Sequence, residues 1–485
     1  MPGAGRLWAM SPISIRLRSA TASMLALPWL RPLQAWPAEG VAFREMPVGA
    51  SRHVVRFVDV DGVLYALKEM PVGVARREYE NLRELERREF PAVRALGLVE
   101  RGEDEPAVLV TDYLAGSFQF RRLFERIPPS ARKPRDRLLD SMAWLMVDLH
   151  RNGAFWGDCS LANTLFRRDG QTLQAFLVDA ETSEIHPTLS DGQRAYDLEI
   201  LVENVAGDLA DIGAQIGRPS EMIDEDFEAA ERVAQSYRSL WDELHREETI
   251  GPGDRYRVEA RVRRLNELGF AVDELSFEPS PSGGSAGAGA GDAAGTGDAA
   301  GAGDVAGADP DMTAGEPDGH AGGDRLRLRV AVAGRRFHAT ELRRLTGMDV
   351  GEGQATILLN DLHAYRGLLE RREHIPVSEA RAAERWLADI VRPALARLAA
   401  LTLPVVDLVQ AYCDLLEVRW LLSEQAGHDV GDDAAIDALR RRQAPAESAA
   451  GMLGVESPTA VYDLSDWTAG PPETVSADGR HGGTT

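Results

Sequence analysis

Three polar residues in the first half of the chain have the types and the spacing that phosphoryl transfer needs. Asp158 is followed five residues later by Asn163, and Asp179 comes directly after the apolar run Phe176-Leu177-Val178. One carboxylate can accept the proton of a substrate hydroxyl, while an amide oxygen and a second carboxylate can hold Mg²⁺ against nucleotide phosphates. We therefore interpret Asp158 as a general base and Asn163 and Asp179 as metal ligands.

The elements around these residues are predicted to bring them together. Residues 135–152 carry an apolar stripe with helical spacing and lead into the loop of Asp158. Two short strands, 164–167 and 175–178, form a predicted hairpin that would place Asp179 opposite Asn163. A single Asp or Asn in a loop is usually a turn former, but three of them in a helix–loop–hairpin context favour a site.

Two neighbouring residues are interpreted as structural. His150 ends the predicted helix and is not assigned as a proton shuttle. Cys159 is adjacent to the candidate base, but no histidine base is placed near it in the sequence. We therefore expect Cys159 to be a packing residue rather than a nucleophile.

Lysine is almost absent from the chain, so each lysine invites an explanation. Of the 54 basic residues, only Lys68 and Lys133 are lysines. Lys133 lies in a polar Arg/Pro stretch and suggests no special role. Lys68 ends an apolar strand predicted over 63–69, which pairs with a strand over 53–60 through the hairpin turn Asp61-Gly62. A compact ammonium on a long stem suits a contact to phosphates, and arginine does not replace it well; the alternative is a lysine at a strand end in solvent.

A glutamate is the candidate partner of this lysine. A helix is predicted over 73–89, and Glu78, Leu82 and Leu85 share one face of it. A carboxylate on the buried side can orient Lys68 by an ion pair. We take Glu78 as the partner, but the helix contains three other glutamates, each of which is either an alternative partner or a solvated charge: Glu80, Glu84 and Glu86.

At this point the first half of the chain, from residue 40 to about 200, resembles the lipopolysaccharide kinase family (the Kdo/WaaP kind), a bacterial branch of the protein-kinase-like fold. The whole chain looks like a bacterial family that pairs such a half with an uncharacterised C-terminal domain. The resemblance rests on Ala66-Leu67-Lys68, Arg77-Glu78-Tyr79, Leu149-His150, Gly157-Asp158 with Asn163, and Leu177-Val178-Asp179-Ala180-Glu181.

The resemblance implies an ATP- and Mg²⁺-dependent kinase with assigned roles. Lys68 would contact nucleotide phosphates and Glu78 would position Lys68. Asp158 would be the base, and Asn163 and Asp179 would bind magnesium. The segment after the strand at 107–111 looks like the hinge between two lobes, with backbone groups of Asp112 and Leu114 near adenine, and the turn with Gly49 and Ser51 would cover the phosphates.

The chain also departs from such families. Trp156-Gly157-Asp158 stands where they often have His-Gly-Asp, and the loop around Gly49 holds one glycine where protein kinases have three. No Phe-Gly pair follows Asp179, and Asp179-Ala180-Glu181 resembles the acid-x-acid ending of small-molecule kinases. Each departure moves the predicted substrate from proteins toward small molecules. Asp191 and Arg194 are candidates to line the acceptor site, and the simpler alternative is helix capping by Ser190 or Asp191.

Composition limits the remaining possibilities. The net charge of −23 argues against a nucleic-acid partner, and the two cysteines, Cys159 and Cys413, give no disulfide or metal spacing. The apolar run 24–30 is no convincing signal peptide, and no run approaches the length that spans a bilayer. We expect a cytoplasmic protein.

The predicted fold class is α+β: a bilobal protein-kinase-like fold, a linker and a smaller, mostly helical C-terminal domain. The predicted parts are an irregular N-terminal segment 1–40, an N-lobe 41–116, a C-lobe 117–278, a Gly/Ala/Asp-rich disordered linker 279–324, a C-terminal domain 325–430 and a disordered tail 431–485. In the C-terminal domain, the arginines Arg335, Arg336, Arg343, Arg344, Arg371 and Arg372 either form a basic patch for an anionic head group or a partner, or are simply solvated.

Two hypotheses remain. The first is a phosphotransferase that acts on a hydroxyl of a sugar, glycolipid or other small molecule. The second is a catalytically weak, kinase-shaped module that binds nucleotide or nothing and serves as a regulatory or scaffold protein. Its C-terminal domain would then be the part that binds a protein partner. The complete set of lysine, glutamate, base and two metal ligands favours the first.

Overall fold

A computed structural model of the chain divides into two compact units. One comprises Met1–Glu243 with Gly334–Thr485, and the other comprises Leu244–Ala333. The described residues are 13–18, 20–46, 52–102, 104–126, 132–215, 217, 223–251, 253–279, 325–401, 407–441, 443–445 and 448. The predicted linker, apart from Pro279, and the end of the predicted tail lie outside them.

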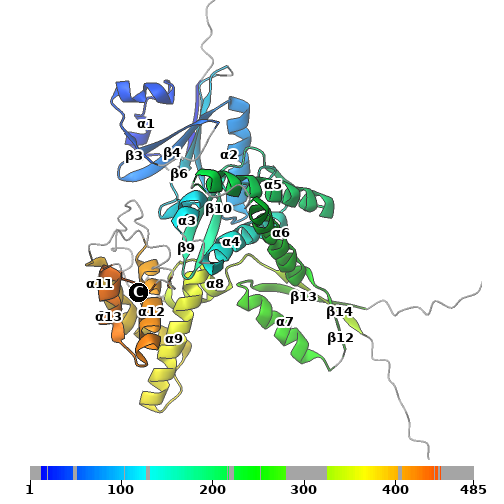
Figure 1. Ribbon diagram of the computed structural model, residues 1–485, viewed down its shortest axis with the longest axis vertical. Helices are drawn as coiled ribbons and strands as arrows, with labels where there is room; N and C mark the ends of the chain where they lie inside the picture. The colour runs from blue at the N-terminus through cyan, green and yellow to red at the C-terminus, as the bar shows by residue number, and fades with distance from the viewer. Residues whose placement is uncertain are drawn as a thin grey trace, which may run out of the picture. The chain divides into compact units, whose positions relative to one another are not determined.

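A six-stranded sheet opens the first unit (Figure 1), with its strands in the order β1-β5-β6-β4-β3-β2. The bounds are β1 Ser14–Leu17, β2 Phe43–Arg44, β3 Val54–Val60, β4 Val63–Met70, β5 Ala95–Glu100 and β6 Ala107–Asp112. The β3–β4 hairpin turns at Asp61 and Gly62, whose φ values of 54° and 81° are those of a two-residue hairpin turn. The predicted hairpin is confirmed, and it places Lys68 opposite Val55 and Leu109 in the sheet.

The N-terminal segment is ordered where it is described, so the prediction of an irregular segment over 1–40 is wrong there. β1 pairs antiparallel with β5, and Trp29, Leu33 and Trp36 are buried in the same apolar cluster as residues of the sheet. The pattern escaped sequence analysis because β1 has only four residues. In addition, the buried side chains Leu33 and Trp36 belong to a 3-10 helix, Leu33–Glu39. Their spacing is three residues, which matches neither the alternation of a strand nor the repeat of an α-helix.

Helix α2, Val72–Arg87, packs beside β5 and β6. Its buried face consists of Ala75, Glu78, Leu82 and Leu85, at helical spacing. The helix and its face agree with the prediction. A glutamate is therefore fixed on the apolar side of the helix that faces the sheet.

The described residues from 117 to 245 are mainly helical and also form two small sheets, β10-β9-β7 and β11-β8. The elements are β7 Ser117–Gln119, α3 Phe120–Arg126, α4 Arg132–Arg151, β8 Ala154–Phe155, β9 Thr164–Asp169, β10 Thr172–Leu177, β11 Glu184–Ile185, α5 Asp191–Gln215 and α6 Ile223–His245. The predicted helix and the predicted hairpin after the Asp158 loop correspond to α4 and to β9–β10.

The C-terminal part of this unit is a helical domain with its own core. Its helices are α8 Phe337–Thr346, α9 Glu352–Glu373, α10 Glu379–Trp386, α11 Arg392–Ala399, α12 Leu408–Ala426 and α13 Gly431–Arg440. Trp386 and Tyr412 are almost fully buried in it. Because α13 packs against α12 through Ala435 and Ile436, the prediction of a disordered tail from residue 431 is wrong at its beginning.

The second unit is a small sheet with one helix. Strands β12 Glu248–Ile250, β13 Val272–Pro279 and β14 Leu326–Val332 lie in the order β12-β14-β13, and α7 spans Arg255–Glu267. β13 and β14 pair antiparallel although residues 280–325 separate them. The predicted C-lobe boundary at residue 278 is therefore wrong, because residues 244–279 build a sheet with a strand from beyond the linker.

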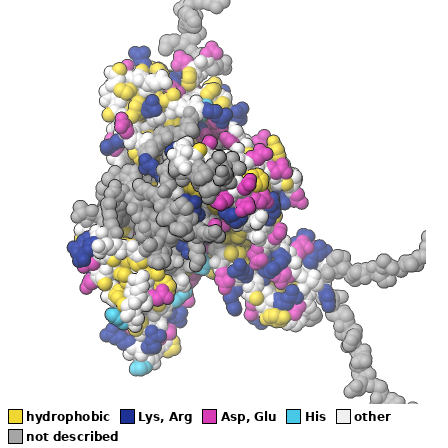
Figure 2. Space-filling view, viewed as in Figure 1, with side chains coloured by type: hydrophobic (Ala, Val, Ile, Leu, Met, Phe, Trp, Pro, Cys, Tyr) yellow, Lys and Arg dark blue, Asp and Glu magenta, His cyan; other side chains and the backbone are white. Residues whose placement is uncertain are grey.

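Charges of both signs are interspersed over the described surface seen in Figure 2. Several arginines considered for a basic patch have acidic or aromatic neighbours: Arg336 and Arg343 contact Asp349, Arg344 contacts Glu341, and Arg335 lies over the ring of Trp144. These contacts of the arginines favour the interpretation of a mixed arginine surface over that of a dedicated anion-binding patch.

Within the described part of the chain, no helix is both long and apolar enough to cross a bilayer.

Candidate active site

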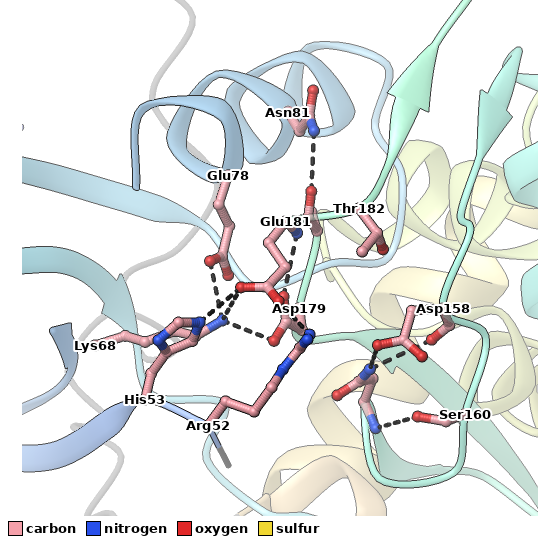
Figure 3. A network of polar contacts seen from close by, with 12 residues as sticks. Arg52, His53, Lys68, Glu78, Asn81, Asp158, Ser160, Asp179, Glu181 and Thr182 are labelled. Carbon is pink, nitrogen blue, oxygen red and sulfur yellow. Dashed lines mark hydrogen bonds and ion pairs between the residues drawn. The ribbon is translucent and has the colours of Figure 1, made fainter. Parts of the chain in front are cut away.

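The site is centred on Lys68, whose ammonium bridges two carboxylates from distant parts of the chain (Figure 3). Lys68 Nζ donates to Glu78 Oε2 at 3.0 Å and to Asp179 Oδ2 at 2.7 Å. Lys68 lies on β4, Glu78 on α2, and Asp179 two residues beyond β10. The structure therefore joins the lysine, its predicted glutamate and a predicted metal ligand in one cluster.

Burial makes this cluster electrostatically unusual. Glu78 is only 1% exposed, and burial, together with the charge of Asp179, raises its pKa to about 8 despite the opposing effect of Lys68. For Lys68, burial alone would lower the pKa, but Glu78 and Asp179 raise it overall. The lysine therefore stays charged, and the carboxylates around it repel one another.

Glu181 is a third acid in the cluster, which the sequence indicated only through its acid-x-acid spacing. Its Oε2 lies 2.8 Å from His53 Nε2 and 3.9 Å from Lys68 Nζ, and Arg52 also donates to it. One oxygen each from Glu78, Asp179 and Glu181 lie within 4.8 Å of one another, close enough to surround a cation. Glu181 also links the loop after β10 to the residues that precede β3 (Figure 3).

The candidate base lies on a separate loop between α4 and β9. Asn163 Nδ2 donates to Asp158 Oδ2 at 3.1 Å, and Asn204 Nδ2 of α5 approaches Asp158 Oδ1 at 3.4 Å. Two amides therefore orient the Asp158 carboxylate. Asn204 was not recognised from the sequence, since it has no motif and lies in the middle of a long helix.

The backbone of this loop is held by a buried aspartate of α5. Asp197 is fully buried and accepts from the amides of Trp156 and Gly157 at 2.8 and 2.9 Å. Burial by itself would raise the pKa of Asp197, but the hydrogen bonds from His150 and from these amides lower it overall. Burial lowers the pKa of His150, which lies between Asp197 and Tyr237, so its structural interpretation agrees with its position.

Trp156, just before the loop of the candidate base, takes part in the site architecture. The Trp156 ring is buried, and its Nε1 donates to the carbonyl of Asp179 at 3.3 Å. Thr182 returns a bond from its hydroxyl to the carbonyl of Trp156. An indole N–H therefore ties the loop of the base to the segment of the metal ligand. Cys159, beside the base, is fully buried, and burial raises the pKa of its thiol, as expected for a packing residue.

The β9–β10 hairpin joins the two metal-ligand candidates, and α2 is fastened to the segment that carries one of them, Asp179. The amide of Val178 donates to the carbonyl of Asn163 at 3.1 Å. This backbone hydrogen bond joins Asn163 to the residue that directly precedes Asp179. Asn81 of α2 donates to the carbonyls of Ala180 and Ser183 at 2.9 and 2.7 Å. Helix α2 is thereby fastened directly to the segment that carries Asp179.

The other predicted contacts are less complete. Asp112 accepts from the amide and guanidinium of Arg94, and the carbonyl of Leu114 accepts from Ser117, so these groups shape a turn between β6 and β7. Gly49 and Ser51 lie outside the described residues. Ser190 caps α5 through Gln193, and Arg194 contacts Asp191 and the ring of Trp241, which favours the capping interpretation.

Comparisons with known proteins give two family matches and a similar solved structure. Residues 60–219 match the model of the lipopolysaccharide kinase (Kdo/WaaP) family, and residues 239–287 and 316–442 match a domain of unknown function, DUF4032. Among solved structures, "WaaP in complex with acyl carrier protein" shares 20% identity and a TM-score of 0.31, covering 47% of this chain and 99% of that chain. The search of curated proteins gave no match. The predicted resemblance is confirmed, and residues 60–219 are similar to kinase-like phosphotransferases.

Proposed function

We propose that the region matching the lipopolysaccharide kinase family is the catalytic part of an ATP- and Mg²⁺-dependent phosphotransferase that acts on a hydroxyl of a sugar, glycolipid or other small molecule. One observation carries the proposal: the Lys68 ammonium lies 3.0 Å from Glu78 and 2.7 Å from Asp179. A lysine drawn into a cluster of acids, in a chain with only two lysines, fits a phosphate-binding role better than a packing role.

In this proposal the nucleotide binds between the sheet and the loop of Asp158. Lys68 contacts the phosphates, and Glu78 holds the ammonium in place. Backbone groups of Asp112 and Leu114 contact adenine, and the turn with Gly49 and Ser51 covers the phosphates. Lysine suits this contact because its ammonium is a compact charge on a flexible stem.

Asn163 and Asp179 are the residues that would hold Mg²⁺. Oxygen ligands from a carboxylate and an amide are those that this ion prefers. The amide nitrogen of Asn163 is used in the bond to Asp158, which directs its Oδ1 away from that carboxylate. When bound, Mg²⁺ would neutralise charge on the transferred phosphoryl group, and Glu181 is close enough to adjust the local charge.

Asp158 acts as the base for the acceptor. The proton of the acceptor hydroxyl passes to the Asp158 carboxylate while the hydroxyl oxygen forms a bond to the γ-phosphorus. The bond between that phosphorus and its bridging oxygen breaks, and its electron pair leaves with ADP. Asn163 and Asn204 orient the carboxylate without neutralising it.

The short connection after Asp179 supports a small acceptor. Only residues 180–190 separate Asp179 from the start of α5 at Asp191, and they include β11. Asn81, Trp156 and neighbouring groups fasten this segment at several points. It offers no long loop of the kind that protein kinases order by phosphorylation.

The experiment is a thermal-shift assay with ATP, with and without Mg²⁺, followed by a transfer assay. We expect wild-type protein to show a Mg²⁺-dependent rise in Tm that Asp179→Ala loses and that the exposed control Asp211→Ala keeps. Asp158→Ala should keep the shift and lower kcat by about 10²- to 10⁴-fold. Equal shifts for wild type and Asp179→Ala would overturn the proposal, and a shift without any transfer would favour a nucleotide-binding module.

A further inference from the structure

The tip of the β9–β10 hairpin is held by the helical C-terminal domain (Figure 1). Arg168 makes a two-pronged ion pair with Asp414 of α12. Gln410, one turn earlier on the same helix, accepts from the Gly170 amide at 2.8 Å and donates to the Gly170 carbonyl at 3.0 Å. The side-chain amide of Gln410 therefore forms hydrogen bonds with both the N–H and the C=O group of Gly170.

A second set of contacts comes from the beginning of α9. The carboxylate of Asp169 accepts from the amides of Gly353 and Gln354 at 2.8 and 2.9 Å, so a hairpin residue caps a helix of the other domain. Asp169 is 5% exposed. Burial raises its pKa, and the two helix amides oppose this shift, as expected for an acid placed at the positive end of a helix.

The two backbones approach so closely that only glycine fits. A Cβ on Gly170 would lie 2.7 Å from the Gly353 carbonyl oxygen, and a Cβ on Gly353 would collide with the carbonyl oxygen of Asp169. Gly353 has no unusual φ that would require glycine. Its lack of a side chain is therefore explained by the contact with the hairpin.

The same hairpin ends at the candidate active site. Asn163 immediately precedes β9, and Asp179 follows β10 by two residues. The strands pair without a register shift from Thr164↔Leu177 to Thr172↔Asp169. β7 pairs with β9 on its other side, so the hairpin is part of a three-stranded sheet. Because β9 and β10 are paired continuously from the tip to the site, fixing the tip also restrains the opposite end.

From these contacts we propose that the C-terminal helical domain positions the two metal ligands of the kinase-like half. Asp169, Gln410 and Asp414 are positioning residues that act through the hairpin on Asn163 and Asp179. The part of the inference that concerns Mg²⁺ rests on the proposed function. The part that concerns the coupling of the two hairpin ends does not.

The coupling is tested in the full-length chain by hydrogen exchange, with matched glycine variants on one helix. Gly353→Ala removes the close approach, whereas Gly367→Ala adds a methyl on α9 where the nearest neighbour is 3.7 Å away. We expect Gly353→Ala, and not Gly367→Ala, to speed exchange of the Val178 amide, which bonds the Asn163 carbonyl, by about 10-fold. Faster exchange confined to 168–172 would overturn the inference.

A second pair of variants, which perturbs the backbone less, keeps the test decisive if Gly353→Ala fails to fold. Gln410→Ala removes the contact to Gly170, and Gln425→Ala is its control at an exposed position of the same helix. We expect Gln410→Ala alone to raise the Mg²⁺ concentration at half-maximal thermal shift with ATP by about 10-fold, with kcat at saturating Mg²⁺ less affected. A merely structural role would lower Tm and leave the Mg²⁺ midpoint unchanged.

The outcomes separate this inference from the proposed function. If the wild type shows no Mg²⁺-dependent response but the Val178 amide still responds to Gly353→Ala, the proposed function fails and the coupling stands. If the wild type binds Mg²⁺ with ATP and neither variant changes the exchange of Val178 or the Mg²⁺ midpoint, the coupling fails and the proposed function stands.

Discussion

The two ends of the β9–β10 hairpin carry polar clusters that differ in how their charges are compensated. At the tip, Asp414 faces Arg168 and Asp169 faces two helix amides, so each acid has its own donors. At the other end, Glu78 and Asp179 share one ammonium, that of Lys68. We call the tip matched, because each of its acids has its own donors. The site end is unmatched, because it has more acidic groups than the single ammonium of Lys68 compensates.

The difference shows how to separate structural from functional polar clusters. A buried charge with a purely structural role has enough partners of opposite charge or hydrogen-bond donors at suitable distances, because an uncompensated buried charge destabilises the native state. An unmatched cluster persists when a ligand supplies the missing compensation or when catalysis needs the perturbed groups. The pKa of about 8 for Glu78 is the mark of such a cluster, and the following predictions test the contrast.

The largest effect is expected from removing the shared cation. Lys68→Met should lower the free energy of unfolding by about 3 kcal/mol above pH 8, where Glu78 is ionised, because it leaves buried carboxylates without their partner. Chemical denaturation measures this loss. The double variant Lys68→Met/Glu78→Gln should recover more than half of it, and no recovery would mean that the acids do not repel one another.

A smaller effect is expected from pH. A carboxyl whose pKa is raised on folding holds its proton more tightly in the native state, so stability falls as pH rises from the unfolded value to the folded one. Burial raises the pKa of Asp148 to about 6 and that of Glu78 to about 8. Between pH 6 and 8 we expect the free energy of unfolding to fall with a limiting slope of ~1.4 kcal/mol per pH unit.

Denaturation of Glu78→Gln over the same pH range is the control for this slope. The glutamine does not titrate, so the part of the slope that Glu78 causes should be absent, and only contributions from other groups, such as Asp148, should remain. Asp414→Asn, at the matched end of the hairpin, should keep the wild-type slope. If Glu78→Gln keeps the slope as well, the site end is not the source of the pH dependence.

At the matched end, we expect a substitution to lower the free energy of unfolding by the same amount across the pH range of 6 to 8. Asp414→Ala should cost about 2 kcal/mol, because Arg168 then loses its charged acceptor. A double-mutant cycle with Arg168→Ala should show that the two single losses are not additive. Additive losses would mean that the ion pair contributes nothing beyond its separate side chains.

Local patterns made much of the kinase-like half predictable. The hairpin turn at Asp61-Gly62, the buried face of α2 and the loop from Asp158 to Asn163 each depend on residues close together in the sequence. Lys68 was predicted to have a role because lysine is so rare in this chain, and Glu78 was predicted as its partner because it shares a helix face with Leu82 and Leu85. Such signals do not require knowledge of the tertiary fold.

The missed features depend on distant contacts. β1 is a strand only because β5 offers it an edge, and residues 244–279 leave the predicted C-lobe because β14 pairs with β13 from beyond the linker. Asp197 and Asn204 lie on α5 and act on a loop some 40 residues earlier. An aspartate on a helix does not reveal from its neighbours in sequence which backbone amides it will meet.

The smallest effect is expected where charge is matched but exposed. Asp191 pairs with Arg194 at the start of α5, with 96% of the Asp191 side chain exposed. Solvent screens such a pair, so Asp191→Ala should shift Tm by less than about 2 °C and leave transfer activity unchanged. Arg194 keeps its bond to the Leu189 carbonyl and its place over Trp241 in that variant. A loss of transfer without a change in Tm would instead return Asp191 to the acceptor site, and the contrast between matched and unmatched charge would no longer identify the functional residues of this chain.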